Sequence, residues 1–321
     1  MSPKTKNSRP FEFTHPANQM HFAPSDFESV HCDFCGADDY TKRYEKRGFW
    51  MVQCNHCGLV YTNPRLTQEK ISALYDADYF QGHGFDESVN YVKEVNEHSG
   101  KERFTLDDWD CDCIASLIAS HGPSANGAKL LEIGCGTGVW LDKARKHGFD
   151  CHGLELSEYA AGFVRNMGIP VETKSIEDAN FAEGSFDVIV MREVIEHLPH
   201  PLQSLQTVHK WLRSGGVLFM ATGNYDCPER KLKGSDWFYF MPEGHLTVFS
   251  NKTMTAYLKK VGFASVNVTN QGDKLMEMLR SNGIIGPGSA KPRNPFKRVI
   301  FGLVRGVNHF ISSGMRIYAV K

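Results

Sequence analysis

Leu130–Gly138 reads LLEIGCGTG, and this stretch decides the fold class. Its first residues form a short apolar run, and Gly134, Gly136 and Gly138 follow where a helix is expected to begin. Glycines at such a turn let a ligand approach the backbone closely, because a Cβ atom would occupy that space. A strand, a glycine-rich turn and a helix in this order are typical of doubly wound α/β domains that bind nucleotide-like cofactors.

The spacing of the glycines narrows the choice of cofactor. The turn has the order GxGxG, whereas the dinucleotide fingerprint is GxGxxG, and Val139 occupies the position of its last glycine. No GK[ST] follows, so a phosphate-binding P-loop is excluded. Glu155 ends the second predicted strand, 21 residues after Gly134. A carboxylate at that position can accept hydrogen bonds from two ribose hydroxyls.

Strands and helices alternate from Lys129 onward. The predicted strands are 129–134, 150–156, 171–175, 186–191, 215–222 and 265–269, with 315–320 as a last edge strand. The predicted helices are 139–147, 201–212 and 253–261. The run 186–191 is continuously apolar, as expected of a buried parallel strand. This alternation implies right-handed crossovers and an α/β fold with a doubly wound, mostly parallel sheet of seven strands.

Five segments within residues 129–270 carry a resemblance to a known family. They are LLEIGCGTG (130–138), GLELS (153–157), SIEDANFAEGSFDVIV (175–190), EVIEHLPHP (193–201) and LRSGGVLFMATGN (212–224). In them the chain resembles the class I S-adenosylmethionine (SAM)-dependent methyltransferases, especially the ubiquinone-biosynthesis O-methyltransferase-like branch. The resemblance implies SAM as the cofactor.

The same resemblance assigns seven residues to SAM: Glu132, Gly134, Gly136, Gly138, Glu155, Ile176 and Glu177. It implies that Gly134 and Gly136 approach the methionine part and that Glu155 binds the ribose hydroxyls. Glu132 resembles the acidic residue near the amino group, and Ile176 and Glu177 would border the adenine. The alternative is that Ile176 is only a core residue and that Glu177 is solvated.

Two CxxC pairs, Cys32 with Cys35 and Cys54 with Cys57, are separated by 18 residues. Each two-residue gap lets both sulfurs bind one ion, and the intervening residues can form a hairpin that joins the pairs. Four thiolates leave no open position, so the spacing predicts a structural zinc site. Iron ligation and four unrelated thiols are the alternatives. The stretch resembles the zinc-ribbon head of many bacterial methyltransferases. Sugar C-methyltransferases among them have a further C-terminal domain, for which this sequence is expected to be too short, and this disfavours an assignment as a sugar C-methyltransferase.

Glu193, Glu196 and His197 follow the fourth strand at spacing i, i+3 and i+4, so one helical turn would place them on a common face. His197 is a candidate general base, because its ordinary pKa is near neutral. Alternatively the three residues bind a divalent cation that orients the acceptor, since ubiquinone and small-RNA methyltransferases place metal ligands at a similar Glu-x-x-Glu-His. In the third interpretation His197 only packs beneath the SAM site.

An aromatic-rich segment, residues 237–250, follows the fifth strand and ends in HLTVFS. Its aromatic side chains either cover an acceptor pocket or belong to the core. His245 is the second catalytic candidate, and it either faces the acceptor or joins His197 at a cation. The alternative for His245 is a hydrogen bond where the next helix begins, near Ser250.

The chain has 321 residues, a net charge of −1, 41% hydrophobic and 23% charged residues. These values predict a globular, cytoplasmic protein without a secretory signal or a membrane span, and they disfavour nucleic acid as a partner. We expect four parts: a flexible arm (1–28), a zinc ribbon (29–66), a helical connector or lid (67–125) and a SAM-binding domain (126–321). The amphipathic stretch 296–311 is expected to pack on that domain, with a membrane surface as the alternative.

The sequence therefore predicts a SAM-dependent methyltransferase with a structural zinc ion. Its acceptor is expected to be a small molecule, methylated on an oxygen of a sugar, phenol or natural-product intermediate. The alternatives are an RNA 2′-O-methyltransferase, which would need a basic channel, and a non-catalytic SAM-binding or zinc-scaffold protein.

Overall fold

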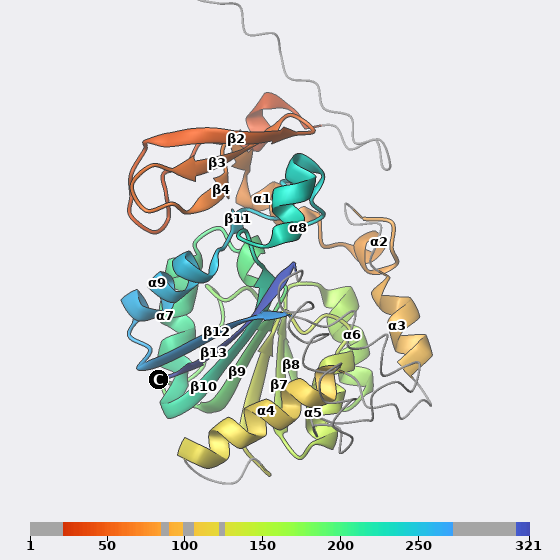
Figure 1. The fold of residues 1–321 in the computed structure, drawn as a ribbon. Coiled ribbons are helices and arrows are strands. Elements are labelled where there is room, and N and C mark those ends of the chain that lie inside the picture. The colour runs from red at the N-terminus through yellow and green to blue at the C-terminus, as the bar shows by residue number, and fades with distance from the viewer. Residues whose placement is uncertain (1–21, 85–89, 99–105, 122–125, 272–312) are drawn as a thin grey trace, which may run out of the picture.

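The fold is seen in a computed structural model, which describes residues 22–84, 90–98, 106–121, 126–271 and 313–321 (Figure 1). Its centre is a seven-stranded sheet in the order β12-β13-β10-β9-β6-β7-β8. The strands are β6 (Lys129–Ile133), β7 (Asp150–Glu155), β8 (Val171–Thr173), β9 (Phe186–Arg192), β10 (Leu212–Gly223), β12 (Ser265–Gln271) and β13 (Gly314–Val320). The five strands from β10 to β8 are parallel, whereas β13 is antiparallel to both of its neighbours. The predicted doubly wound, mostly parallel sheet is confirmed.

Helices cover both faces of this sheet (Figure 1). The helices are α4 (Leu106–His121), α5 (Val139–Lys146), α6 (Glu158–Asn166), α7 (Pro201–Trp211) and α9 (Asn251–Val261). Neighbouring strand residues alternate between two core clusters, because successive side chains of a strand point to opposite faces. Leu130 and Val188 pack with α4 and α5, whereas Leu131 and Ile189 pack with α7 and α9.

The last strand, β13, does not lie at the edge of the sheet, which corrects the prediction for 315–320. Gly314–Val320 pairs with β10 on one side and with β12 on the other, and every residue of the strand is buried. Its backbone polar groups therefore find partners on both sides, which a buried strand requires. Arg316 of β13 is also buried and forms an ion pair with Asp110 of α4 (Nε–Oδ1 2.7 Å).

The cysteine-containing segment forms a second sheet of four strands in the order β11-β4-β3-β2. Its strands are β2 (Tyr40–Lys46), β3 (Phe49–Cys54), β4 (Val60–Thr62) and β11 (Thr247–Val248). Strand β11 comes from the far end of the chain and pairs with β4 in antiparallel fashion. The parts expected at 29–66 and 126–321 therefore share one sheet and form a continuous structure.

Part of the expected flexible arm is ordered. A 3₁₀ turn, η1 (Pro24–Asp26), leads into β1 (Phe27–Glu28), which pairs with β5 (Arg65–Leu66). The ring of Phe27 packs against that of Phe49, with 5.4 Å between ring centroids. This apolar contact anchors the segment to the ribbon, which a polar composition alone did not suggest.

The remaining elements are short helices. They are α1 (Gln68–Ala73), α2 (Ala77–Phe80), α3 (Tyr91–His98), η2 (Ile195–His197), α8 (Pro228–Lys233) and η3 (Gly234–Asp236). Helix α4, expected in the connector, packs on β10 and belongs to the central sheet. The amphipathic stretch 296–311 lies outside the described residues. No helix of the described ranges combines the length and apolar character needed to cross a membrane.

Candidate active site

The glycine-rich turn joins β6 to α5 in a conformation that favours glycine. Gly134, Gly136 and Gly138 all have positive φ, at 66°, 52° and 81°. A Cβ atom on Gly134 would lie 2.5 Å from Cγ2 of Val194, so this position also lacks the space for a side chain. The turn is therefore built from glycine for two reasons, backbone conformation and close packing.

Glu155, at the end of β7, closes this turn from the side. One carboxylate oxygen accepts the Gly136 N–H (2.8 Å) and the other accepts the Ser157 N–H (2.9 Å). Burial raises the pKa of the Glu155 carboxyl, and these N–H donors oppose the shift. Each oxygen has a second lone pair, so the group can still accept hydrogen bonds from a ligand.

A cavity of about 360 Å³ lies over the turn. It is lined by these residues assigned to SAM in the sequence analysis: Glu132, Gly134, Gly136, Glu155, Ile176 and Glu177. Gly138 does not line it, because it faces α6, where a Cβ atom would come within 2.9 Å of Val164. Gly138 therefore lets α5 pack closely on α6.

Aromatic side chains from the connector also line this cavity. They are Tyr75, Tyr79, Phe80 and Tyr91, which follow α1 or belong to α2 and α3. Sequence reasoning did not single them out, although the cluster of aromatic residues between 75 and 91 was a visible signal. Residues of the connector between 68 and 91 therefore contribute apolar surface to the cavity.

His197 lines the inner end of the cavity, and its environment selects a tautomer. Nδ1 lies 2.9 Å from the Gly244 carbonyl oxygen and 2.8 Å from the Tyr75 hydroxyl. A carbonyl can only accept, so Nδ1 carries the proton and shares it between the two oxygens. Nε2 of the neutral ring then has the lone pair that can accept a proton or bind a cation.

His245 lies directly behind His197, with 4.6 Å between ring centroids. It is buried and is not among the cavity-lining residues, so it does not face an acceptor there. Its Nδ1 donates to the Tyr239 carbonyl oxygen (2.8 Å), which again leaves the lone pair on Nε2. Burial lowers the pKa of His245 to about 4, so the ring is neutral near pH 7.

Glu196 completes a group of three possible metal ligands with the two histidines. The ligand atoms of Glu196, His197 and His245 all lie within 4.8 Å of one another. Both carboxylate oxygens of Glu196 are buried without a well-formed hydrogen bond, and the side chains of Glu193 and Thr222 lie close to them. Burial, and after it the charge of Glu193, raise the pKa of the Glu196 carboxyl well above its usual value. A divalent cation would satisfy such a carboxylate.

Glu193 differs from the expected geometry. The short helix η2 begins only at Ile195, and Glu193 precedes it with a φ of 51°. Its carboxylate accepts a hydrogen bond from the Tyr239 hydroxyl (2.9 Å) and lines the cavity. The single helical face predicted for Glu193, Glu196 and His197 is therefore not formed, and His245 takes the place of Glu193 in the ligand group.

Most aromatic side chains of the segment 237–250 are buried, Phe238 is exposed, and none of them lines the cavity. Trp237 and Phe240 are fully buried and pack in one cluster with Met51 and Val60 of the ribbon. This cluster joins the two sheets through apolar contacts. Of the two interpretations given for this segment, the structure supports the core.

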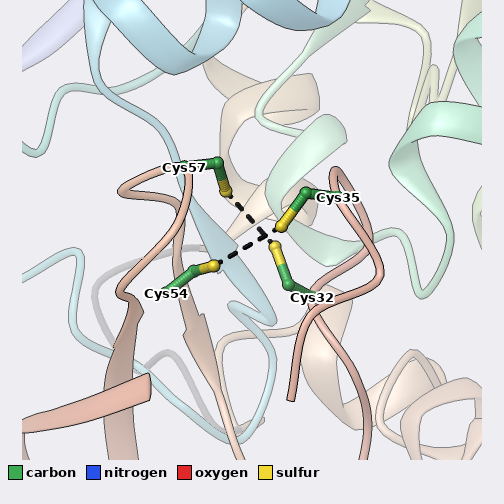
Figure 2. A group of neighbouring side chains, drawn as sticks. All are labelled: Cys32, Cys35, Cys54 and Cys57. Atoms are coloured by element: carbon green, nitrogen blue, oxygen red, sulfur yellow. Dashed lines mark hydrogen bonds between the residues drawn. The ribbon is translucent and has the colours of Figure 1, made fainter. Parts of the chain in front are cut away.

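The four cysteines of the ribbon meet at one point (Figure 2). The Sγ atoms of Cys32 and Cys57 are 3.4 Å apart, and those of Cys35 and Cys54 are 3.5 Å apart. Four thiolates around a tetrahedral zinc ion would lie about 3.8 Å apart, given a Zn–S bond of about 2.3 Å. Burial raises the pKa of Cys54, but backbone N–H groups of Cys57 and His56 outweigh it and lower that pKa to about 7. The cluster therefore fits a structural metal ion.

Residues 111–268 match a family model described as a methyltransferase domain (Methyltransf_23). The match extends from α4 to β12 and includes the glycine-rich turn, Glu155 and His197. With the strand order and the cavity, it defines a class I SAM-dependent methyltransferase domain.

The chain is also similar to curated proteins. The ubiquinone biosynthesis O-methyltransferase of Pseudomonas aeruginosa (strain UCBPP-PA14) is 30% identical over 105 residues, which cover 30% of this chain and 45% of that protein. The enzyme of the same name from Methylococcus capsulatus is 32% identical over 115 residues, covering 34% and 48%. The chain thus spans about half the length of the curated relatives it matches.

A solved structure is also similar. It is a SAM-dependent methyltransferase from Archaeoglobus fulgidus with 15% identity, which covers 72% of this chain and 99% of that one with a TM-score of 0.48.

Proposed function

We propose that the protein transfers the methyl group of SAM to an oxygen of a small-molecule acceptor, such as a sugar, phenol or natural-product intermediate. One observation carries this proposal: a single cavity is lined by the SAM-type turn, by His197 and by four aromatic side chains of the connector. Its volume of about 360 Å³ lies in the range of small-molecule sites, about 300–1,000 Å³.

Methyl transfer from a sulfonium needs mainly orientation of the acceptor and removal of its proton. Aromatic side chains such as Tyr75 and Tyr79 supply a face on which an apolar or ring-containing acceptor can lie. Nε2 of His197 supplies the lone pair that would take the acceptor proton. The Gly244 carbonyl holds the ring in the required tautomer.

The same lone pairs suit a second role for His197. We propose that Glu196, His197 and His245 hold a divalent cation. Each histidine donates Nδ1–H to a backbone carbonyl, which is the usual support of a metal-bound imidazole. A bound divalent cation would polarise an acceptor hydroxyl and lower its pKa. In that case Glu193, whose carboxylate lines the cavity, would be the group that takes the proton released by the acceptor hydroxyl.

The ribbon cysteines would hold a separate zinc ion with a purely structural role. Metal analysis of the purified protein separates the two sites. Cys54→Ser should remove about one equivalent of zinc, whereas Cys113→Ser, which lies outside the cluster, should remove none. His245→Asn should abolish Mn²⁺ binding and leave the zinc content unchanged.

Calorimetry with S-adenosylhomocysteine (SAH), followed by an acceptor screen with isotope-labelled SAM, tests the function itself. We expect SAH binding and label transfer to a hydroxylated small molecule. Binding of SAH without transfer to any small molecule, but with transfer to RNA, would replace the proposed acceptor class. Absence of SAH binding would refute the proposal as a whole.

A further inference from the structure

One segment of the methyltransferase domain is held by the ribbon at several points. This wall segment, residues 196–202, carries His197 and leads into α7. Its residues Leu198 and Pro199 line the cavity beside His197. The ribbon residues that hold the wall segment do not line that cavity. They can therefore affect the cavity only through the residues that they contact.

The first contact is indirect: Thr62, the last residue of β4, reaches the wall segment through residues 245 and 246. Its hydroxyl donates to the carbonyl oxygen of His245 (3.0 Å), with the sulfur of Met51 as a weaker second acceptor at 3.2 Å. Its N–H donates to the carbonyl oxygen of Leu246 (2.9 Å), and the Leu246 N–H donates to that of Glu196 (2.7 Å). Thr62 is fully buried, so this chain of hydrogen bonds is shielded from water.

These hydrogen bonds continue a sheet. Strand β11 pairs with β4 immediately after His245, with Thr247 opposite Tyr61 and Val248 opposite Val60. The backbone on which His245 is placed is therefore an extension of the ribbon sheet. Glu196, at the start of the wall segment, is attached to the same extension through Leu246.

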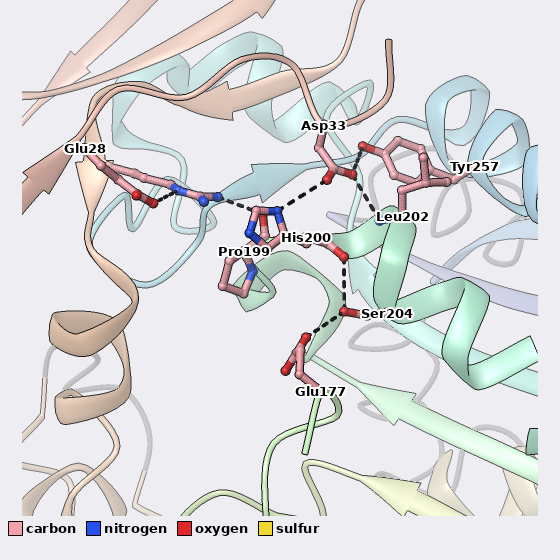
Figure 3. A network of polar contacts seen from close by, with 9 residues as sticks. Glu28, Asp33, Glu177, Pro199, His200, Leu202, Ser204 and Tyr257 are labelled. Carbon is pink, nitrogen blue, oxygen red and sulfur yellow. Dashed lines mark hydrogen bonds and ion pairs between the residues drawn. The ribbon is translucent and has the colours of Figure 1, made fainter. Parts of the chain in front are cut away.

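The second and third contacts hold the other end of the wall segment. Arg65 of β5 donates from Nη1 to the carbonyl oxygen of Pro199 (2.8 Å) and is fixed by an ion pair with Glu28. Asp33, between two metal-site cysteines, accepts the N–H of Leu202 (3.0 Å) and the hydroxyl of Tyr257 (3.0 Å). Figure 3 shows Asp33 reaching from the ribbon to the beginning of α7.

The contact of Asp33 has the character of a helix cap supplied by another part of the chain. The side chain of His200, at the N-cap of α7, makes no capping hydrogen bond, and Asp33 satisfies the N–H of Leu202 instead. A carboxylate at this position also interacts favourably with the helix dipole. One turn further, Ser204 donates to Glu177 (3.2 Å), which lines the cofactor end of the cavity (Figure 3).

We propose that the cysteine ribbon positions the active site through the wall segment, with Thr62, Arg65 and Asp33 as positioning residues. Thr62 sets the relative placement of His245, Glu196 and His197, and Asp33 sets the beginning of α7 and, through Ser204, the side chain of Glu177. The effect on turnover rests on the proposed function, whereas the effect on side-chain placement does not.

The test compares Thr62→Val, which removes only the hydroxyl, with Thr62→Ser, which keeps it. Thr41→Val is the matched control, because the Thr41 hydroxyl bonds to Asn55 within the ribbon and far from the wall segment. The wild type and the three variants are labelled with ¹³C-histidine, and the ring resonances of His197 and His245 are recorded by NMR. Methyl transfer and SAH affinity are measured in parallel.

We expect Thr62→Val to shift both histidine resonances and to lower kcat about tenfold or more, because small misplacements of reacting groups are costly. The Kd for SAH should stay within about twofold of the wild type, since the hydroxyl of Thr62 does not reach the cofactor end. Thr62→Ser and Thr41→Val should behave like the wild type. Wild-type resonances in Thr62→Val would overturn the proposal.

The resonance measurement decides this inference even if the wild type methylates no small molecule, so the two proposals fail separately. If Thr62→Val does not fold, Asp33→Ala tests the other end. Loss of this cap should weaken SAH binding about three- to tenfold, and Asp33→Asn, which keeps an acceptor oxygen, should restore most of it. Unchanged SAH affinity together with unchanged histidine resonances in Asp33→Ala would refute the positioning role.

Discussion

Replacing Glu155 by Gln tests the cofactor site most directly. In the structure both carboxylate oxygens face N–H donors, from Gly136 on one side and Ser157 on the other. Whichever way the Gln amide is oriented, its NH₂ group meets one of these donors. The variant therefore loses a backbone contact and the charge that strengthens hydrogen bonds to a ribose.

A hydrogen bond to a charged group contributes about 1.5–3 kcal/mol. Losing one such bond, with the turn displaced, should weaken SAH binding by about 2–3 kcal/mol, which is about 30- to 150-fold in Kd. Isothermal titration calorimetry with SAH measures this change. The matched control is Glu158→Gln, because Glu158 lies at the start of α6 and pairs with Arg165 on the surface.

We expect the control to bind SAH within about twofold of the wild type. A Kd for Glu155→Gln within about threefold of the wild-type value would refute the assignment of this carboxylate to the cofactor. Thermal unfolding of both variants shows whether either of them has lost the fold. No large loss of stability is expected from Glu155→Gln, because burial of the charged group is itself unfavourable.

Two predictions concern stability. Asp110→Ala removes the buried ion pair with Arg316 and should cost about 3–5 kcal/mol in urea unfolding. Asp112→Ala, on an exposed side chain of the same helix, should cost under about 0.5 kcal/mol. Equal losses in the two variants would contradict the argument. Burial raises the pKa of Asp142, but its ion pairs with basic side chains of α5 outweigh that and lower it. The contribution of the Asp142 carboxylate to stability is therefore present above about pH 4 and is lost as the pH falls further. Asp142→Asn should destabilise the protein by about 0.5 kcal/mol at pH 7 and by less at pH 3. An equal destabilisation at the two pH values would contradict this argument.

The cofactor end of the site was predictable because its determinants are local. The glycines of 134–138 and the carboxylate of Glu155 are required by the conformation of one turn and the end of one strand. Each also lies within a short segment whose pattern resembles known methyltransferases. The sequence order of such elements determines their spatial order in a doubly wound sheet, so the structure brings these residues together as expected.

The acceptor end was predicted less completely, because its contacts join distant segments. Tyr75 meets His197 across 122 positions of sequence, and β4 meets β11 across more than 180. Periodicity within either segment contains no information about such a pairing. Spacing alone also placed Glu193 on a helical face, although its backbone has a positive φ that ends any helix there.

The edge position predicted for the last strand failed for a related reason. A strand at the end of a chain has no following element to suggest a neighbour, so its place in the sheet depends on which edge remains available. The buried ion pair between Arg316 and Asp110 could not be read from the sequence either. It links the final strand to α4, two elements separated by the whole domain.

The strand pairing between β4 and β11 also governs how the chain folds during its synthesis. The cysteine pairs and the hairpin of β2 and β3 leave the ribosome early and need only local contacts. Residues 247–248 follow Thr62 by about 185 positions, which at about 5–20 residues per second is a delay of about 10–40 s. Throughout that interval the edge of β4 has no strand beside it, and the apolar residues that pack on Trp237 are exposed. An early ribbon with an open, apolar edge is a species that chaperones would recognise.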